Sequence, residues 1–288
     1  MNGILTVDKP AGWTSHDVVA RVRRLAQTRR VGHAGTLDPM ATGVLVVLIG
    51  RATRAAEFAE AQVKGYLAHI RFGMTTDTLD TEGRPLSSGG AVPALPEIEA
   101  VLPRFRGEIE QIPPMYSAIK LNGRKLYEIA RSGGEVERAA RRVAISRLDC
   151  RGPLEDGDFA LDIECSKGTY VRSLCADIGD ALGCGACMSA LRRTYSGAFH
   201  VEDALTLEEI ECRGVEDCLL PVDALFAGRP ALRIEDERAE RALRNGADVN
   251  LDTDFAGECR VYSRSGEFLL LGAVKGGVLH TIKSFFEV

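Results

Sequence analysis

One twelve-residue stretch, GHAGTLDPMATG at residues 32–43, constrains the fold more than any other part of this chain. Its three glycines and one proline disfavour regular helix and strand, so we expect a shaped loop. The apolar run VLVVLI follows at residues 44–49. It is too short to cross a membrane and is rich in β-branched residues, which predicts a buried strand. The single carboxylate of the loop, Asp38, is therefore anchored by core structure.

Two interpretations of Asp38 follow from these residues. A carboxylate on an anchored loop suits catalysis, because loops carry reactive groups while the scaffold fixes their position. Asp-Pro after a glycine-rich run is also common in plain turns, and the loop alone favours the turn. The longer string GHAGTLDPMATGVL, however, resembles the signature of the TruB family of tRNA pseudouridine synthases. That resemblance implies that Asp38 is the catalytic aspartate.

Length and composition predict a globular protein. A chain of 288 residues, with 45% hydrophobic and 27% charged residues, can form one large domain and a smaller one. The N-terminal sequence has no signal-peptide pattern, and no apolar run reaches the length of a membrane span. We therefore expect a cytoplasmic protein that does not contact a membrane.

The eight cysteines predict reduced thiols, because a chain of this length without a secretion signal does not need a disulfide framework. Cys184 and Cys187 have the spacing of a metal-binding pair. No second pair of this kind and no nearby pair of histidines completes a zinc site, and His33 has no second histidine at ligand spacing. We expect no bound metal.

Charge is distributed unevenly along the chain. The net charge of −5 at first argues against a nucleic-acid partner. Residues 1–72, however, hold 10 basic and 5 acidic residues, and residues 120–147 hold 8 and 3, whereas residues 149–228 hold 6 and 16. A polyanion can contact the two basic segments. Ordinary solvated faces give the same counts, so charge alone leaves both interpretations open.

The hydrophobic pattern predicts short strands and helices. Thr14 and Asp17 resemble a capping box, and apolar residues at helical spacing predict a helix over residues 15–27. Two-residue alternation over 64–73 predicts a strand with Tyr66 on its apolar face. The other elements predicted in this half are a strand over 4–7, a helix over 54–61, a polar loop over 74–83, a linker over 87–96 and a helix over 96–104.

In the second half, the pattern of predicted elements changes at about residue 230. Before it, alternation over 159–165 predicts a strand, and a basic turn within residues 166–174 leads into a helix. After it, a helix over 237–245 closed by Gly246 precedes short β-type runs at 260–262, 268–274 and 278–282. These runs predict a small β domain whose ALRNG and GGVL segments resemble a PUA-type RNA-binding module. Its 9 basic and 10 acidic residues give no electrostatic support for RNA contact.

The resemblance to the TruB family runs across nearly the whole chain and implies roles for individual residues. Arg172, in SKGTYVRSL, is implied to pair with Asp38 and to hold that carboxylate ionised and aimed. Tyr66 is implied to stack on the target base. The plain alternatives are an ion pair elsewhere and a core tyrosine. The residues implied to bind the substrate nucleotide or shape its pocket are His33, Tyr170, Leu191, Lys9 and Lys167, and Lys9 is also implied to support the catalytic loop.

A second strong match begins with IPPMYSAIK at residues 112–120. In the family this region carries a mobile insertion that grips RNA, which we place at about residues 112–147. Its basic side chains alternate with tyrosines, an arrangement that fits contacts with RNA backbone and bases, and Gly133-Gly134 can act as a hinge. The residues implied to bind RNA are Lys120, Arg124, Tyr127 and Arg131.

The resemblance implies an α+β pseudouridine synthase fold with a mixed, mainly antiparallel sheet flanked by helices over residues 1–228, and a β-rich PUA-like domain over 229–288. It implies conversion of uridine to pseudouridine at position 55 in the T-arm of tRNA, with the base flipped out of its stack. The loop at 74–83 and the segment 120–131 favour the stand-alone bacterial type. We expect a monomer that needs neither cofactor nor guide RNA.

The chemistry implied by the resemblance breaks the C1′–N1 bond and forms C1′–C5 without redox change. Whether Asp38 attacks C1′, attacks C6 or deprotonates C2′ stays open, and the base that removes the C5 proton stays unassigned. Two other functions remain: a non-enzymatic RNA chaperone of the same fold, and a guide-RNA-dependent ribosomal RNA synthase. The presence of Asp38, Tyr66 and Arg172 together argues against a purely binding role.

Overall fold

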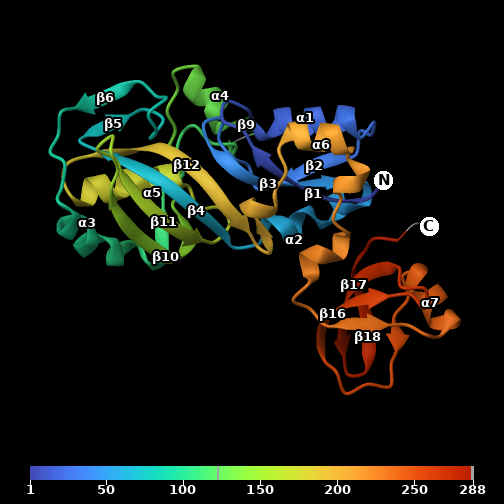
Figure 1. The fold of residues 1–288 in the computed structure, drawn as a ribbon. Helices are drawn as coiled ribbons and strands as arrows, with labels where there is room; N and C mark the ends of the chain where they lie inside the picture. Colours follow the sequence, from blue (N-terminus) through green and yellow to red (C-terminus); the bar gives the residue numbers. More distant parts are fainter. Residues whose placement is uncertain (122, 287–288) are drawn as a thin grey trace.

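The computed structural model describes residues 1–121 and 123–286 and contains a larger and a smaller body (Figure 1). The strands of the larger body are β1 (Gly3–Lys9), β2 (Val31–Ala34), β3 (Thr42–Ile49), β4 (Lys64–Phe72), β7 (Gly107–Gln111), β10 (Arg141–Pro153), β11 (Phe159–Cys165), β12 (Ala186–Ser196) and β13 (Phe199–His200). They form a nine-stranded sheet in the order β1-β3-β12-β4-β11-β10-β7, with β2 on β3 and β13 on β12. Only the pairing of β12 with β3 is parallel. The predicted α+β fold with a mixed, mainly antiparallel sheet is confirmed.

Strand β3 determines where the Asp38 loop arises. One side of β3 pairs with β1 along its length. The other side is divided, because β2 pairs with residues 46–49 and β12 pairs with residues 42 and 43. The loop of residues 35–41 spans the gap between these two partners. Residues 32–34 lie in β2, so the prediction of a loop over all of 32–43 is wrong at both ends, where hydrogen bonding to neighbouring strands outweighs the conformational cost of glycine.

The predicted N-terminal helix is present as α1 (Ser15–Leu25), with the capping box of Thr14 and Asp17 formed. It ends before residue 27, because Gln27 adopts a left-handed φ of 49°. The alternation predicted in β4 is also confirmed, since Tyr66 is buried on one face together with the other apolar residues of the strand, Ala68, Ile70 and Phe72.

Other predicted boundaries shift. The helix predicted over 54–61 is a 3₁₀ turn, η1 (Gly50–Ala55), followed by α2 (Ala56–Glu60). The predicted loop and linker include a hairpin of β5 (Met74–Thr76) and β6 (Pro85–Ser88). Helix α3 (Leu95–Val101) is shorter than predicted and continues as the 3₁₀ turn η2 (Leu102–Phe105). Helices α5 (Val171–Ala181) and α3 share one apolar core with β4, β10, β11 and β12.

Between β7 and β10 the chain leaves the sheet. This excursion carries the two-residue strands β8 (Lys120–Leu121) and β9 (Arg124–Lys125) and helix α4 (Leu126–Arg131). Residues 141–147, which the predicted insertion included, lie in β10 and pair with β7 or β11. The described residues of 112–140 therefore lie outside this sheet, and we call this segment the excursion.

The larger body ends with α6 (Leu207–Arg213), which shares an apolar core with α1, and with three short 3₁₀ turns, η3 (Val201–Asp203), η4 (Glu216–Cys218) and η5 (Val222–Phe226). None of the helices in the described part of the chain has the length and apolar character needed to span a membrane.

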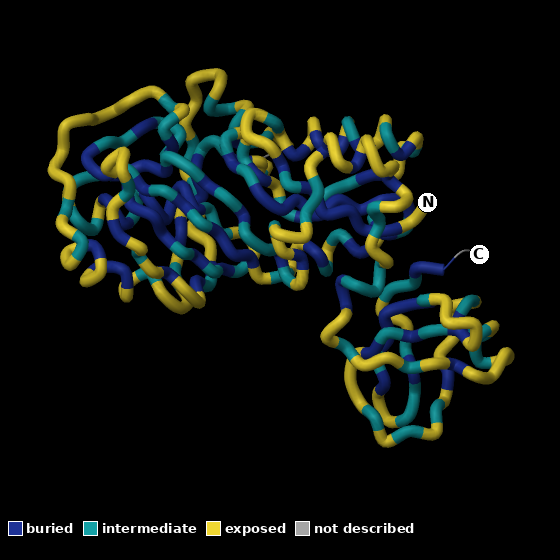
Figure 2. The backbone as a smooth tube through the Cα atoms, viewed as in Figure 1, coloured by how far each residue is buried: buried dark blue, intermediate teal, exposed yellow. Residues whose placement is uncertain are grey.

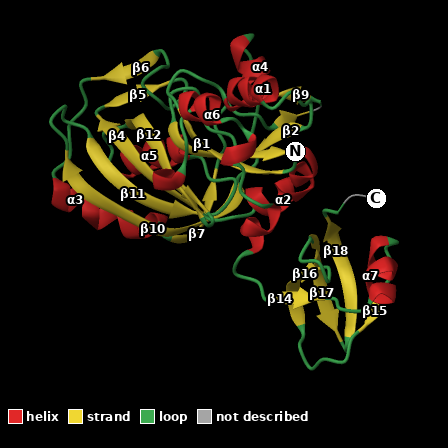
Figure 3. Ribbon diagram, turned by 45° about the vertical axis from the view of Figure 1, so that its right-hand side comes forward, coloured by secondary structure: helices red, strands yellow, loops and turns green. Residues whose placement is uncertain are grey.

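The smaller body has a sheet and a core of its own. Its elements are β14 (Ala231–Arg233), α7 (Glu237–Arg244), β15 (Val249–Asn250), β16 (Gly257–Tyr262), β17 (Phe268–Lys275) and β18 (Val278–Ser284), with strand order β14-β16-β17-β18-β15. Figure 2 shows the buried residues of the two bodies as separate regions, and Figure 3 shows α7 beside the smaller sheet. Phe226 of the larger body contacts the rings of Phe268 and Phe285, so apolar side chains join the two bodies.

Candidate active site around Asp38 and Arg172

The Asp38 loop is held by hydrogen bonds on both sides of the carboxylate. The buried Ser15 hydroxyl accepts a hydrogen bond from the Leu37 N–H (2.9 Å) and donates one to the Leu37 carbonyl (3.2 Å). On the other side, the Gly12 N–H donates to the Pro39 carbonyl (2.9 Å). The start of α1 and the turn before it therefore fix the backbone that carries Asp38.

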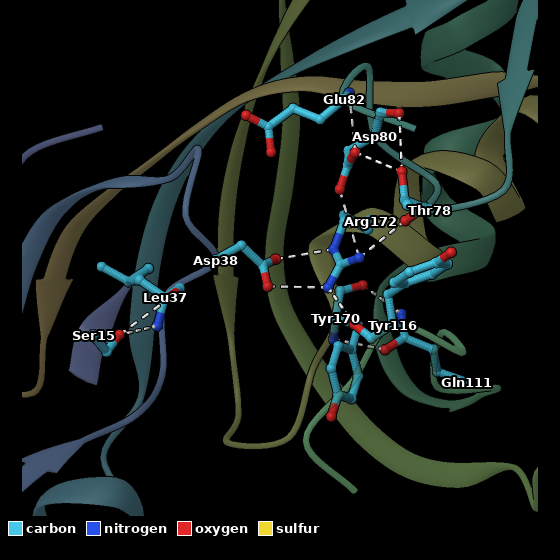
Figure 4. A network of polar contacts seen from close by, with 10 residues as sticks. All are labelled: Ser15, Leu37, Asp38, Thr78, Asp80, Glu82, Gln111, Tyr116, Tyr170 and Arg172. Carbon is cyan, nitrogen blue, oxygen red and sulfur yellow. Dashed lines mark hydrogen bonds and ion pairs between the residues drawn. The ribbon is translucent and has the colours of Figure 1, made fainter. Parts of the chain in front are cut away.

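Arg172, in the first turn of α5, meets Asp38 side-on (Figure 4). Its Nε lies 2.9 Å from Oδ2 of Asp38, and its Nη2 donates to Oδ1 at 3.0 Å. The Arg172 side chain is 5% exposed and the Asp38 side chain 34% exposed. The guanidinium is thus buried behind a carboxylate that remains accessible, which suits a group that must reach a substrate.

Three segments distant in the sequence converge on Arg172. Besides Asp38, its guanidinium donates to the carbonyls of Thr78 (2.9 Å) and Tyr116 (2.9 Å) and lies 3.5 Å from the Asp80 carboxylate. Asp80 is held in turn by the Thr78 hydroxyl (2.6 Å) and the Glu82 N–H (3.1 Å). Arg172 therefore links the Asp38 loop, the loop after β5 and the start of the excursion.

The charge state of Asp38 reflects opposing influences. Burial raises the pKa of the Asp38 carboxyl above its ordinary value, and the Asp80 carboxylate acts in the same direction. The Arg172 guanidinium lowers the pKa of Asp38 through its charge and its hydrogen bond. Arg172 therefore favours the ionised form of Asp38 and offsets part of the effect of burial.

Sequence reasoning did not find Asp80, Tyr116 or Gln111. The side chain of Gln111 accepts from the Tyr170 N–H (2.8 Å) and donates to the Tyr170 carbonyl (3.1 Å), which fixes the start of α5 and hence Arg172. The aspartate- and threonine-rich sequence of the loop after β5 was the one signal for Asp80. The Tyr116 contact is made by a backbone carbonyl, which every residue possesses, so no residue type could reveal it.

Tyr66 and Leu191 form an apolar wall near this network. Each is 8% exposed, and they share a core cluster with Leu37, the neighbour of Asp38. Burial raises the pKa of Tyr66, whereas the Arg193 guanidinium lowers it. Tyr170 lies at the start of α5 and is half-buried, and burial raises its pKa too.

His33 lies in β2, outside the loop of residues 35–41. Burial, together with the positive charges of His16 and Arg193, lowers the pKa of His33 to about 4. Its ring meets the edge of the His16 ring at 5.5 Å, and its Nδ1 is buried without a hydrogen-bond partner. His33 is thus a neutral side chain near pH 7, and its Nδ1 is enclosed without a hydrogen-bond partner.

Lys9 lies buried beside the Asp38 loop. It is fully buried, and its ammonium donates to the carbonyls of Pro10 (2.9 Å), Trp13 (2.5 Å) and Pro39 (3.1 Å). Burial lowers the pKa of Lys9 to about 8. All three of its N–H groups are used, and the contact with Pro39 supports the catalytic loop, while contact of Lys9 with substrate stays a prediction. Lys167 is exposed in the turn before α5.

The excursion presents its basic residues to solvent. Lys120, Arg124 and Arg131 are exposed. Tyr127 lies between two cations, with the Arg131 guanidinium 5.5 Å and the Lys125 ammonium 5.3 Å from its ring centroid. These residues are placed to meet a large partner, while Tyr116 at the base of the excursion contacts Arg172.

Among the residues that the structure describes, no group of three or more His, Cys, Asp and Glu side chains is placed to hold a metal ion. Cys184 and Cys187 are free thiols there, one half-buried and the other buried.

Comparison with known proteins reveals close relatives. A profile for the TruB family pseudouridylate synthase (N terminal domain) matches residues 23–171, and one for the tRNA pseudouridylate synthase B C-terminal domain matches residues 172–227. The tRNA pseudouridine synthase B of Clostridium kluyveri is 41% identical over 99% of this chain and 100% of its own length. That of Heliobacterium modesticaldum is 49% identical over 88% of this chain and 84% of its own length.

Two solved structures contain chains with a similar fold and sequence. A chain in the crystal structure of a Cbf5-Nop10-Gar1 complex aligns with a TM-score of 0.74 and 28% identity, covering 99% of this chain and 85% of that chain. A chain in an H/ACA RNP bound to a substrate RNA containing 2′-deoxyuridine aligns with a TM-score of 0.72 and 27% identity, over 99% and 85% of the two chains. Both profiles end by residue 227, before β14 of the smaller body.

Proposed function

This chain belongs to the TruB family of pseudouridylate synthases and isomerises uridine to pseudouridine in tRNA, and from this premise we propose that it acts at position 55 in the T-arm. The observation that carries the proposal is the accessible carboxylate of Asp38, gripped side-on by the buried Arg172 and bordered by the apolar wall of Tyr66 and Leu191. This arrangement offers one reactive group and an apolar surface for a planar base.

Asp38 performs the central chemistry of this proposal. The C1′–N1 bond breaks, the uracil turns, C1′–C5 forms, C5 loses a proton and N1 gains one, so no oxidant or reductant is consumed. Asp38 attacks C1′, attacks C6 or removes the C2′ proton. Arg172 serves all three routes, because each requires an ionised and aimed carboxylate.

The pocket receives a base that has left its stack, since a stacked uridine does not expose C1′ and C5 to one carboxylate. Tyr66 stacks on the uracil, Leu191 and Tyr170 complete the wall, and the free Nδ1 of His33 contacts the substrate nucleotide or its neighbour. The exposed Lys120, Arg124 and Arg131 of the excursion, its half-buried Tyr127, and Lys167 bind the RNA backbone and bases around the pocket.

The enzyme acts without a guide RNA, as a cytoplasmic monomer with a catalytic domain over residues 1–228 and a PUA-like domain over 229–288. The bacterial relatives, matched over nearly their whole length, support the stand-alone type. The similarity to a chain in a Cbf5-Nop10-Gar1 complex keeps a guide-dependent enzyme as the alternative to test. A pure RNA chaperone is disfavoured by the ion pair of Asp38 with Arg172, which binding alone does not need.

The test is to incubate purified protein with unmodified tRNA transcript, without guide RNA or added metal, and to map pseudouridine along the transcript. Modification at position 55 is expected, and Asp38→Asn should prevent it. A transcript with cytidine at position 55 controls for site choice. Modification elsewhere, or only after addition of a guide RNA, would contradict the proposal.

A further inference from the structure

Arg193 is a second arginine near the active site, buried more completely than Arg172. Its residue is 0% exposed, in strand β12. Its Nε donates to the Val44 carbonyl (2.7 Å), and Nη1 and Nη2 both donate to the Gly35 carbonyl (3.1 Å each). Gly35 begins the loop that carries Asp38, and Val44 follows it in β3. One guanidinium therefore clamps both ends of the catalytic loop.

The sheet places Arg193 of β12 between strands β3 and β4. In the register of the sheet, Arg193 is opposite Gly43 of β3 on one side and opposite Tyr66 of β4 on the other. The approach to β3 is close, because a Cβ added to Gly43 would lie 2.2 Å from the Arg193 carbonyl oxygen. Arg193 thus lies between the strand that anchors the Asp38 loop and the strand that carries Tyr66.

The charge of Arg193 has no carboxylate paired with it among the described residues. Across residues 1–121 and 123–286, Arg172 pairs with carboxylates, whereas no ion pair is formed by Arg193. Carbonyl groups satisfy its hydrogen bonds without neutralising its charge, so its field reaches neighbouring groups in a medium of low dielectric constant. Consistent with this, the charge of Arg193 lowers the pKa of Tyr66, against the larger effect of burial, which raises it.

We propose that Arg193 is a positioning residue of the isomerisation, which holds the Asp38 loop against the Tyr66 strand and favours the phenolate of Tyr66 as acceptor of the C5 proton. The step balances: the C5–H bond breaks, its electron pair restores the C5–C6 double bond, the proton passes to the Tyr66 oxygen and N1 takes up a proton. This inference rests on the proposed function, because a proton leaves C5 when uridine is converted to pseudouridine.

The first experiment measures the titration of the Tyr66 hydroxyl and does not require catalysis. The protein is labelled with 3-fluorotyrosine, and the Tyr66 signal in the ¹⁹F spectrum is assigned by its loss in Tyr66→Phe. We expect Arg193→Gln to move the titration of this signal to higher pH, and Arg193→Lys, which keeps the charge, to move it less. The matched control is Arg192→Gln, one residue away in β12, because Arg192 pairs with Asp8 instead. An unchanged Tyr66 titration in folded Arg193→Gln overturns the proposal.

The second experiment measures single-turnover rates at saturating tRNA across pH. We expect Arg193→Gln to slow the rate most near pH 7, by roughly tenfold for each unit of pKa shift, and less as pH rises. A loss that is equal at every pH contradicts the role in proton transfer. Circular dichroism and tRNA affinity show whether each variant is folded.

A double-mutant cycle of Arg193→Lys with Tyr66→Phe covers the case in which Arg193→Gln does not fold. Because Arg193 is proposed to act through Tyr66, the rate loss caused by Arg193→Lys should shrink when the hydroxyl is absent. Additive losses overturn the proposal. The fluorine titration still measures the effect of Arg193 on Tyr66 if the wild-type protein makes no pseudouridine. That lack of activity would contradict the proposed function and not the inference about Arg193.

Discussion

The Asp38 loop and the excursion of residues 112–140 both reach Arg172, but they are held in different ways. The loop is braced by Ser15, Lys9 and Arg193, all of them buried. The excursion contacts Arg172 through the Tyr116 carbonyl and exposes most of its basic residues. The difference fits the proposed roles, in which chemistry takes place on the rigidly braced segment and RNA binds to the segment that is open to solvent.

The largest loss of activity is expected from a substitution in the Asp38 loop. Asp38→Asn should lower the single-turnover rate by roughly 10⁴-fold or more, because an amide can neither attack carbon nor accept a proton as the carboxylate does. Binding of tRNA should persist, since the excursion is untouched. Product formation is measured by mapping pseudouridine. A near-normal rate at saturating tRNA would remove Asp38 from the mechanism.

Tyr66→Phe should come next. The ring remains, so stacking and tRNA affinity should be kept, while the rate should fall by about 10²–10⁴-fold if the hydroxyl accepts the C5 proton. Binding and single-turnover rates are measured on the same samples. Full turnover by Tyr66→Phe would leave stacking as its sole role and would also contradict the role proposed for Arg193.

Arg172→Lys should slow the reaction by roughly 10²-fold and change its pH dependence, because the side-on pairing with both Asp38 oxygens is lost. Arg172 lowers the pKa of Asp38, so losing this pairing should raise it further. Activity needs the carboxylate and is lost as pH falls through that pKa. The acid limb of the rate profile should therefore move to higher pH. A limb that stays in place or moves to lower pH would show that Arg172 does not maintain the ionised form.

The excursion should show the opposite signature. Neutralising Lys120, Arg124 and Arg131 together should weaken tRNA binding and flatten its dependence on salt, by roughly 0.7–0.9 in log K per phosphate contact and decade of salt. The saturated single-turnover rate should stay nearly unchanged. Titrations at several salt concentrations test this. An unchanged salt slope with a collapsed rate would place these residues in active-site assembly.

The smallest effect is expected for Cys184→Ser combined with Cys187→Ser, which should leave the rate unchanged, as should chelators. These thiols lie outside the Arg172 network, and none of the described residues forms a metal-binding group with them. Zinc content by mass spectrometry and activity after chelation are the measurements. Stoichiometric zinc whose removal abolishes activity would contradict this expectation.

The sequence predicted the parts of the site that depend on residue type. The helix that begins at Ser15, the alternating strand of Tyr66 and the pairing of Arg172 with Asp38 could be anticipated from spacing or from resemblance, although the helix ends earlier than predicted. The contact of Tyr116 with Arg172 could not, because it uses a backbone carbonyl brought close by tertiary structure. The burial of Lys9 among carbonyls could not be predicted either, because a lysine in the sequence is ordinarily expected at the surface.

The division of β3 between two neighbours, β2 and β12, also bears on the recovery of activity after denaturation. The two contacts with β12 are parallel and join residues 150 positions apart, so they close a long loop. A shift of one residue in that pairing would move the anchor of Asp38 by about 3.3 Å and reverse which face each side chain occupies. Such a molecule would be compact yet inactive. After refolding, the fraction that binds and converts tRNA should therefore lag behind the fraction that has regained its secondary structure, and circular dichroism alone would overstate the yield.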